Sequence, residues 1–138
     1  MNYAKVFSIE LSVRDYECDL QGIVNNAVYL NYFEHTRHQF LKNLGIDFAE
    51  LHAAGTDPVV RRIEIDYRRS LKSGDIFQSR LTVEKKGRLQ YIFRQNIVTV
   101  GDEVEMARAV NFVAFVRQGK PIQPPEEIAK AVEHWWSS

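Results

Sequence analysis

The sequence contains a single cysteine, Cys18, among its 138 residues. One thiol can form neither an internal disulfide nor a multi-cysteine metal site, so disulfide-stapled folds are excluded and a reducing cytoplasm is the expected location. Glycine and proline are also few, at seven and four residues. This scarcity excludes collagen-like and low-complexity chains.

An excess of charge of one sign is also missing, because 18 Lys and Arg residues face 18 Asp and Glu residues. A general nucleic-acid binder usually carries a strong basic excess, so we expect no nucleic-acid partner. The balance is uneven along the chain, however. Residues 1–60 hold four basic and eight acidic side chains, residues 61–94 hold ten and four, and residues 95–138 hold four and six.

Long hydrophobic runs are absent as well. The longest uncharged stretch, 20–33, is interrupted by one glutamine and three asparagines, so no membrane-spanning helix is expected. The apolar pair Val6-Phe7 is too short for a signal-peptide core. With 45% hydrophobic and 26% charged residues, the chain is typical of one globular domain over residues 1–138.

Hydrophobic spacing predicts the order of the elements. Alternation from Phe7 to Val13 indicates a strand, and apolar residues three and four positions apart predict a long helix over 27–44 that ends before Gly45. A shorter helix is expected over 48–54. The remaining predicted elements are strands near 63–67, 77–83, 89–100 and 104–116, and a final helix over 126–136.

This order predicts an α+β fold in which a mostly antiparallel five-stranded sheet, its last four strands in a meander, wraps one long helix. One helix cannot cover such a sheet and its edges completely. We therefore expect a homodimer or homotetramer that buries the remaining surface.

The loop before the long helix contains the best candidate for catalysis, Asp19. Gly22 and a helix start at Asn25 or Asn26 follow it closely. Unpaired backbone NH groups in the first helical turn can hold a carbonyl oxygen as it gains negative charge. A nearby carboxylate can attack that carbonyl or activate a water, although an aspartate in such a loop also often serves only as a turn former.

Several residues of the loop and helix recur together in a known pattern: an aromatic residue, Asp-x-x-Gly, two aliphatic residues, a tyrosine and Glu-x-x-Arg. They are Tyr16, Asp19, Gly22, Ile23, Val24, Tyr29, Glu34 and Arg37. In this pattern the chain resembles the aspartate-loop branch of the hydroxybenzoyl-CoA thioesterase family, which has the hotdog fold. Asn25-Asn26 followed by Tyr29 is also similar to acyl-acyl carrier protein thioesterases.

The resemblance implies an acyl-CoA thioesterase that needs no metal and no organic cofactor. Asp19 would act as nucleophile or general base, the backbone NH of Asn26 would polarise the thioester carbonyl, and Gly22 would allow close approach of the chain to the substrate. Two positions depart from the pattern of some relatives. Some carry His at the position of Ile23, and others carry His or Tyr at the position of Asn26. The roles of those side chains are therefore replaced or absent here.

The acyl group is expected to contact apolar residues of the long helix and of the following strand, together with residues of a partner subunit. The predicted contacts are Tyr29, Tyr32, Phe33, Val59 and Val60. The basic hairpin with Lys85, Lys86 and Arg88 falls where the resembled family binds the nucleotide end of CoA, and its charge suits phosphates. Solubility alone also explains a basic hairpin tip.

Other candidates have simpler explanations. Cys18 has no cationic neighbour in sequence that would activate its thiol. Glu34 and His38 lie one helical turn apart but lack a third ligand for a metal. Two further functions remain open: a hotdog hydratase or dehydratase, which usually pairs a His with an acid, and a non-catalytic module that binds acyl-CoA or an acyl carrier protein. No such His occurs between residues 16 and 29.

Overall fold

The computed structural model describes residues 5–138. Its long helix and its strands follow the predicted spacing of apolar residues. In chain order the elements are β1 Phe7–Ser12, the 3₁₀ turn η2 Asp15–Glu17, α1 Asn26–Asn43, α2 Phe48–Ala53, β2 Thr56–Tyr67, β3 Ile76–Lys86, β4 Gln90–Thr99, β5 Glu105–Arg117, β6 Lys120–Ile122 and α3 Glu126–Ser137.

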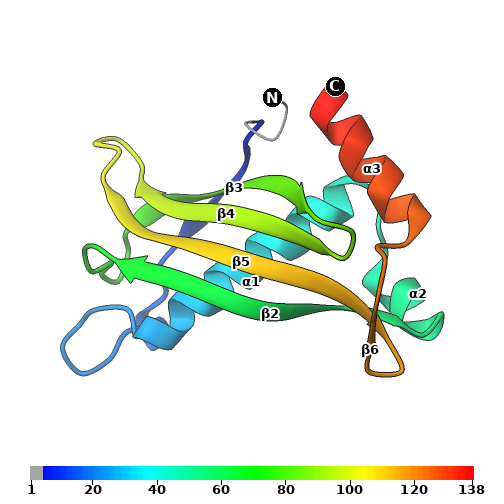
Figure 1. Cartoon of the computed structure of the whole chain (residues 1–138). Helices are drawn as coiled ribbons and strands as arrows, with labels where there is room; N and C mark the ends of the chain where they lie inside the picture. The colour runs from blue at the N-terminus through cyan, green and yellow to red at the C-terminus, as the bar shows by residue number, and fades with distance from the viewer. Residues whose placement is uncertain (1–4) are drawn as a thin grey trace.

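The strands form one antiparallel sheet in the order β1-β3-β4-β5-β2, and the short β6 pairs with β5 (Figure 1). The α+β class is confirmed, but the predicted count of five strands is wrong by one. The sixth strand escaped prediction because β6 has only three residues and one of them is Pro121. Proline is tolerated there because β6 is short and lies outside the main run of strands.

The predicted four-strand meander is also wrong, because only β3, β4 and β5 follow one another. β2 pairs with β5 from Thr56 opposite Arg117 to Tyr67 opposite Ala107, so β2 forms the far edge of the sheet. The loop 68–75 carries the chain back to β3. This loop is held at the end of the sheet by the buried Leu71, whose carbonyl accepts a 2.9 Å hydrogen bond from the Val24 amide. Alternation indicates which face of a strand is buried, but not which strand lies beside it.

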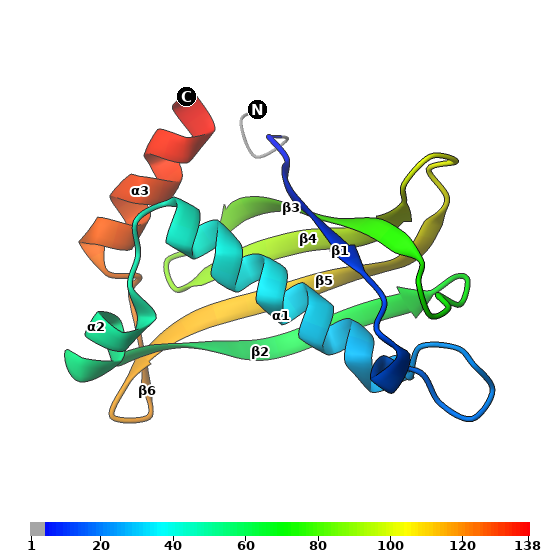
Figure 2. The ribbon, with the colours of Figure 1, turned by 180° about the vertical axis from the view of Figure 1, so that it is seen from behind.

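Helix α1 lies across one face of the sheet (Figure 2). Asn25 caps it, since its side-chain oxygen accepts a 2.9 Å hydrogen bond from the Ala27 amide. Phe33 and Phe40 face the sheet and are completely buried. Burial of two such aromatic side chains contributes several kcal/mol, about 1.5–3 kcal/mol each, and holds the helix against the sheet.

The two ends of the sheet carry different elements (Figure 2). At one end, the Tyr67 hydroxyl of β2 donates a 3.1 Å hydrogen bond to the Asn26 carbonyl at the start of α1. The last turn of α1, α2, α3 and the β3–β4 hairpin lie at the opposite end. None of the helices within residues 5–138 is long and apolar enough to cross a membrane.

Candidate active site

The loop that carries Asp19 is a closed turn. An isolated antiparallel bridge joins Cys18 to Val24. Inside it, the Asp19 amide donates to the Ile23 carbonyl at 2.9 Å and the Gly22 amide donates to the Asp19 carbonyl at 3.0 Å. Gly22 has φ +80°, a left-handed conformation that side chains disfavour. Glycine at this position therefore lets the turn close.

The Asp19 side chain is exposed at the tip of this loop. Its Oδ1 accepts a 2.8 Å hydrogen bond from the Gln21 amide, which orients the carboxylate. Within residues 5–138, no protein donor contacts Oδ2. One oxygen is thus held by the loop while the other is available to a substrate or a water.

The start of α1 lies next to this loop, because the Asn25 amide donates to the Glu17 carbonyl at 3.2 Å. The Asn25 side chain accepts the hydrogen bond of the Ala27 amide. The Asn26 amide, by contrast, has no acceptor among the described residues. A free NH at a helix N-terminus, where the helix dipole is positive, suits a carbonyl oxygen that gains negative charge.

Glu17 fastens the loop to the helix, a role that the sequence analysis missed. Its Oε1 accepts from the Arg14 amide at 2.8 Å and from the Tyr32 hydroxyl at 2.9 Å. Burial and the neighbouring Glu17 raise the pKa of Tyr32, so the phenol stays protonated and continues to donate. The spacing of three residues from Arg14 to Glu17, which is that of a capping box, is the signal that could have revealed this contact.

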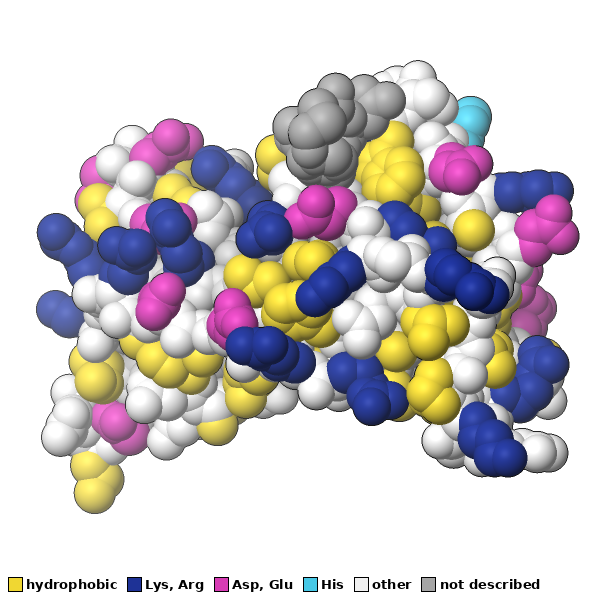
Figure 3. Space-filling view, in the orientation of Figure 1, with side chains coloured by type: hydrophobic (Ala, Val, Ile, Leu, Met, Phe, Trp, Pro, Cys, Tyr) yellow, Lys and Arg dark blue, Asp and Glu magenta, His cyan; other side chains and the backbone are white. Residues whose placement is uncertain are grey.

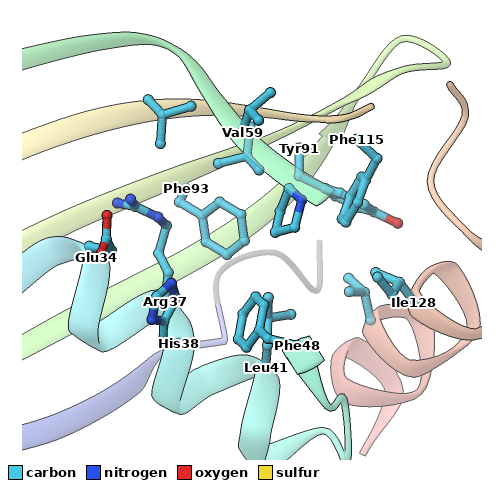
Figure 4. A pocket seen from close by; sticks show the side chains of 14 residues that line it. Glu34, Arg37, His38, Leu41, Phe48, Val59, Tyr91, Phe93, Phe115 and Ile128 are labelled. Carbon is cyan, nitrogen blue, oxygen red and sulfur yellow. The ribbon is translucent and has the colours of Figure 1, made fainter. Parts of the chain in front are cut away.

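The five predicted acyl contacts separate into two groups. Tyr29, Tyr32 and Phe33 are at most 6% exposed and pack in the core between α1 and the sheet. Val59 and Val60 on β2 line a cavity at the other end of the molecule (Figure 4).

This cavity has a volume of about 120 Å³ and lies between α1, the first half of β2 and α3. Arg37 of α1 is part of its wall and is only 8% exposed. Burial lowers the pKa of Arg37 to about 10, partly opposed by Glu34, and the guanidinium donates a 3.0 Å hydrogen bond to Gln95. The Glu-x-x-Arg motif of α1 therefore serves the cavity as well as the packing of the helix.

The basic hairpin lies at the cavity end of the sheet. The Nζ of Lys85 is 5.6 Å from the centre of the Tyr91 ring, and the Nζ of Lys86 is 4.9 Å from that of Phe112. Arg88 is exposed in the turn. Tyr67, which contacts Asn26, aligns across the sheet with Ser79 of β3, seven residues before Lys86. Seven residues of strand span roughly 20 Å. Asp19 and the hairpin of one chain are therefore far apart.

The other basic residues are scattered over the outer face of the sheet between hydrophobic patches (Figure 3). Several are paired with acids. Arg68 lies 3.1 Å from Glu105, and Arg80 lies 3.3 Å from Glu103, and both acids lie outside residues 61–94. The positive sum of residues 61–94 is thus partly compensated on this face, and we expect no broad polyanion site there.

The remaining candidates offer no second site. Cys18 is half-buried as a free thiol. Among residues 5–138 no group of three or more His, Cys, Asp or Glu side chains is placed to hold a metal ion. That the reaction needs no metal and no organic cofactor stays a prediction.

Comparison with known proteins identifies the class. Residues 13–132 match the model of the Thioesterase-like superfamily, and the chain belongs to this family. A solved structure of a protein from Aquifex aeolicus superposes with a TM-score of 0.85 at 27% identity, covering 91% of this chain and 98% of that one. The predicted hotdog fold is confirmed.

Two curated relatives have named activities. An acyl-acyl carrier protein thioesterase of Arabidopsis thaliana, ATL3, is 30% identical over 92% of this chain and 67% of its own length. The acyl-CoA thioesterase YbgC of Haemophilus influenzae is 28% identical over 93% of this chain and 95% of its own. The prediction that the chain is a thioester hydrolase is thereby confirmed at the level of the family.

A double-mutant cycle tests the contact between Glu17 and Tyr32. We expect Tyr32→Phe and Glu17→Ala each to lower the free energy of unfolding by about 1–3 kcal/mol, because each change removes a hydrogen bond to a charged group. The double variant should lose about 1 kcal/mol less than the sum of the two. Urea unfolding measures all three values.

Tyr67→Phe provides the control for this cycle. It removes a hydroxyl group that donates a hydrogen bond to the Asn26 carbonyl and none to Glu17. Its effect should therefore add to that of Glu17→Ala. Additive effects for Tyr32→Phe as well would contradict the proposed anchoring of the loop.

Proposed function

We propose that the protein hydrolyses acyl-CoA thioesters to a free acid and CoA at the loop that carries Asp19. The observation that supports this most is the position of one exposed carboxylate beside the free Asn26 amide at the start of α1. A carboxylate and a carbonyl-polarising NH are the two groups that acyl transfer to water requires.

The thioester carbonyl oxygen accepts a hydrogen bond from the Asn26 amide. In one route Asp19 removes a proton from water, and the oxygen of that water attacks the carbonyl carbon. The tetrahedral intermediate then breaks its C–S bond, and the CoA sulfur leaves and is protonated. In the other route Asp19 attacks the carbon itself, CoA leaves, and water hydrolyses the resulting anhydride. Both routes yield one acid and one thiol, and neither needs a metal or a cofactor.

Gly22 and Asn26 complete this half of the site. Gly22 carries no side chain over the turn, and no protein atom outside its immediate chain neighbours lies within 4 Å of where a Cβ would be. The space above the turn is thus open to substrate. The Asn26 side chain, at a position where some relatives carry His or Tyr, is exposed and can donate to the substrate.

The basic hairpin is proposed to hold the phosphates of CoA. Lys85 and Lys86 lie against aromatic rings, while Arg88 extends into solvent. A cluster of three cations at a strand end binds a small polyanion better than it binds a neutral pantetheine ester.

We propose a homodimer built on the edge strand β2. Val60, Ile63 and Tyr67 of this strand are 45%, 37% and 43% exposed. A long uncovered edge with apolar side chains favours pairing with another strand. A two-fold axis would pair β2 with its copy in antiparallel fashion. That arrangement brings the Asp19 end of one protomer to the hairpin end of its partner.

The compartment is proposed to be the cytoplasm. The chain has one cysteine and forms no disulfide, which fits a reducing environment. We propose no nucleic-acid partner and no membrane insertion.

Replacement of the catalytic carboxylate tests the reaction. Asp19→Asn should lower kcat for release of thiol from acyl-CoA esters by at least about 10²-fold, because the amide can neither attack the carbonyl nor take the proton. Glu10→Gln, an exposed carboxylate on β1, is the matched control and should retain activity. Equal rates for Asp19→Asn and the native protein would rule out the mechanism, and binding without turnover by the native protein would favour the acyl-binding module.

Charge reversal on the hairpin tests the binding of CoA. The double variant Lys85→Glu, Lys86→Glu should raise KM for CoA esters about tenfold or more and leave KM for pantetheine esters nearly unchanged, because only CoA carries the nucleotide phosphates. Steady-state kinetics on both substrates measures the difference. A similar change for both esters would contradict a phosphate site.

A charge on the β2 edge tests the dimer. Ile63→Lys should convert the dimer to monomer in sedimentation equilibrium, since two lysines would face each other across the two-fold axis. Ile76→Lys, which places the same charge on an isoleucine 49% exposed at the start of β3, should leave the dimer intact. An unchanged mass for Ile63→Lys would exclude this interface.

A further inference from the structure

The apolar cavity between α1, β2 and α3 has two unlike ends (Figure 4). At its mouth, Glu34 and His38 of α1 are exposed, and Val60 on the sheet edge is 45% exposed. At its inner end, Ile128 and Val132 of α3 are each 1% exposed. The cavity therefore opens toward the free edge of the sheet and is closed by the last helix.

The inner end offers almost no polar partner to a ligand. Its wall is formed by side chains of β4, β5 and α3 that are apolar except for Tyr91. The Tyr91 hydroxyl points toward α3 (Figure 4). Burial and the nearby Glu133 of α3 raise the pKa of Tyr91 to about 12. A hydroxylated or charged group placed there would lose its hydration without gaining hydrogen bonds, which disfavours it.

Helix α3 is held firmly enough to serve as a floor. The Trp136 indole donates a 2.8 Å hydrogen bond to the Val83 carbonyl of β3. Lys5 donates to the Trp135 carbonyl at 3.1 Å, and its Nζ also lies 4.1 Å from the centre of the Trp135 ring. These contacts tie the last turn of α3 to the sheet and to the N-terminal segment, so the depth of the cavity is set by the side chains that α3 points inward.

The size of the cavity limits its occupant. An apolar cavity of roughly 150 Å³ binds benzene, so a cavity of about 120 Å³ accommodates about five or six carbons. With the thioester carbonyl at the mouth, the acyl group that fits is a straight chain of about six to eight carbons. A chain of sixteen carbons would have to displace α3.

We propose that this cavity binds the acyl chain of the substrate, that the preferred acyl group is a saturated, unsubstituted chain of about six to eight carbons, and that Ile128 and Val132 set this length as the floor of the site. The proposal rests on the thioesterase function proposed above for the carboxyl end of the same acyl group. The thioester would lie at the mouth, at the sheet edge where the dimer brings the partner's helix start.

The test measures kcat/KM for straight-chain acyl-CoA esters from four to sixteen carbons. Ile128→Ala deepens the cavity and should move the optimum about two carbons higher, raising the ratio of the ten-carbon to the six-carbon ester about tenfold, because each methylene in an apolar pocket is discriminated by about tenfold or more. Val132→Leu should move the optimum lower. Ile128→Val replaces the alanine variant if that variant does not fold, with a smaller shift in the same direction.

Ile122→Ala is the matched control. Ile122 packs against the same hydrophobic cluster but does not line the cavity. Its truncation should lower stability and leave the preferred chain length unchanged. A shift as large as that of Ile128→Ala would show that the optimum reports loosened packing and would overturn the proposal.

A second measurement needs no turnover. Free saturated fatty acids of the same lengths, added below their micelle concentrations, should raise Tm most at about six to eight carbons, and Ile128→Ala should move that maximum upward. If acids bind in this way but no ester is hydrolysed, the cavity assignment stands and the proposed function fails. The cavity assignment fails and the proposed function stands if esters are hydrolysed with any of three results. These are rates without a length optimum, an optimum that stays unmoved in the α3 variants, and a preference for hydroxylated aryl esters. No stabilisation by any acid, as expected if partner side chains fill the cavity, also overturns it.

Discussion

The burial of α1 against the sheet is the constraint on which the rest of the structure depends. Phe33 and Phe40, two turns apart and completely buried, hold the helix across the strands. This packing places the first turn of α1 beside the Asp19 loop and its later turns along the cavity. A shift of the helix along its axis would move the Asn26 amide and the cavity wall together, so one hydrophobic contact positions both halves of the proposed site.

The local elements could be predicted from sequence because each follows from a repeating pattern within a few residues. Apolar residues three and four apart predicted α1 to within one residue at each end, and Asn25 proved to be its cap. The position of β2 beside β5 could not be predicted, since pairing depends on contacts between residues forty or more positions apart. The same limit hid the cavity, whose floor on α3 meets β2 only in the folded chain.

In the candidate site, too, the features that are local in sequence could be predicted and those that depend on distant contacts could not. Asp19, Gly22 and Asn26 are close in sequence, and the structure places them together in one turn and helix start. Tyr29, Tyr32 and Phe33 were predicted to meet substrate because they are aromatic and lie on the right helix. Their face of α1 turns to the sheet, however, and Tyr32 instead holds Glu17 in place. Periodicity indicates that a residue is buried, but not whether its neighbours are protein or ligand.

The proposed site joins the carboxylate of one protomer to the basic hairpin of its partner, because these two groups lie roughly 20 Å apart within one chain. Heterodimers that pair one Asp19→Asn protomer with one Lys85→Glu, Lys86→Glu protomer test this claim directly, through their kcat/KM for acyl-CoA hydrolysis. Each parent homodimer should have about one tenth of the native kcat/KM or less. If Asp19 and the hairpin of different protomers share a site, one of the two sites is intact and the heterodimer has about half of the native activity. Activity no higher than that of the two parent homodimers would contradict the shared site.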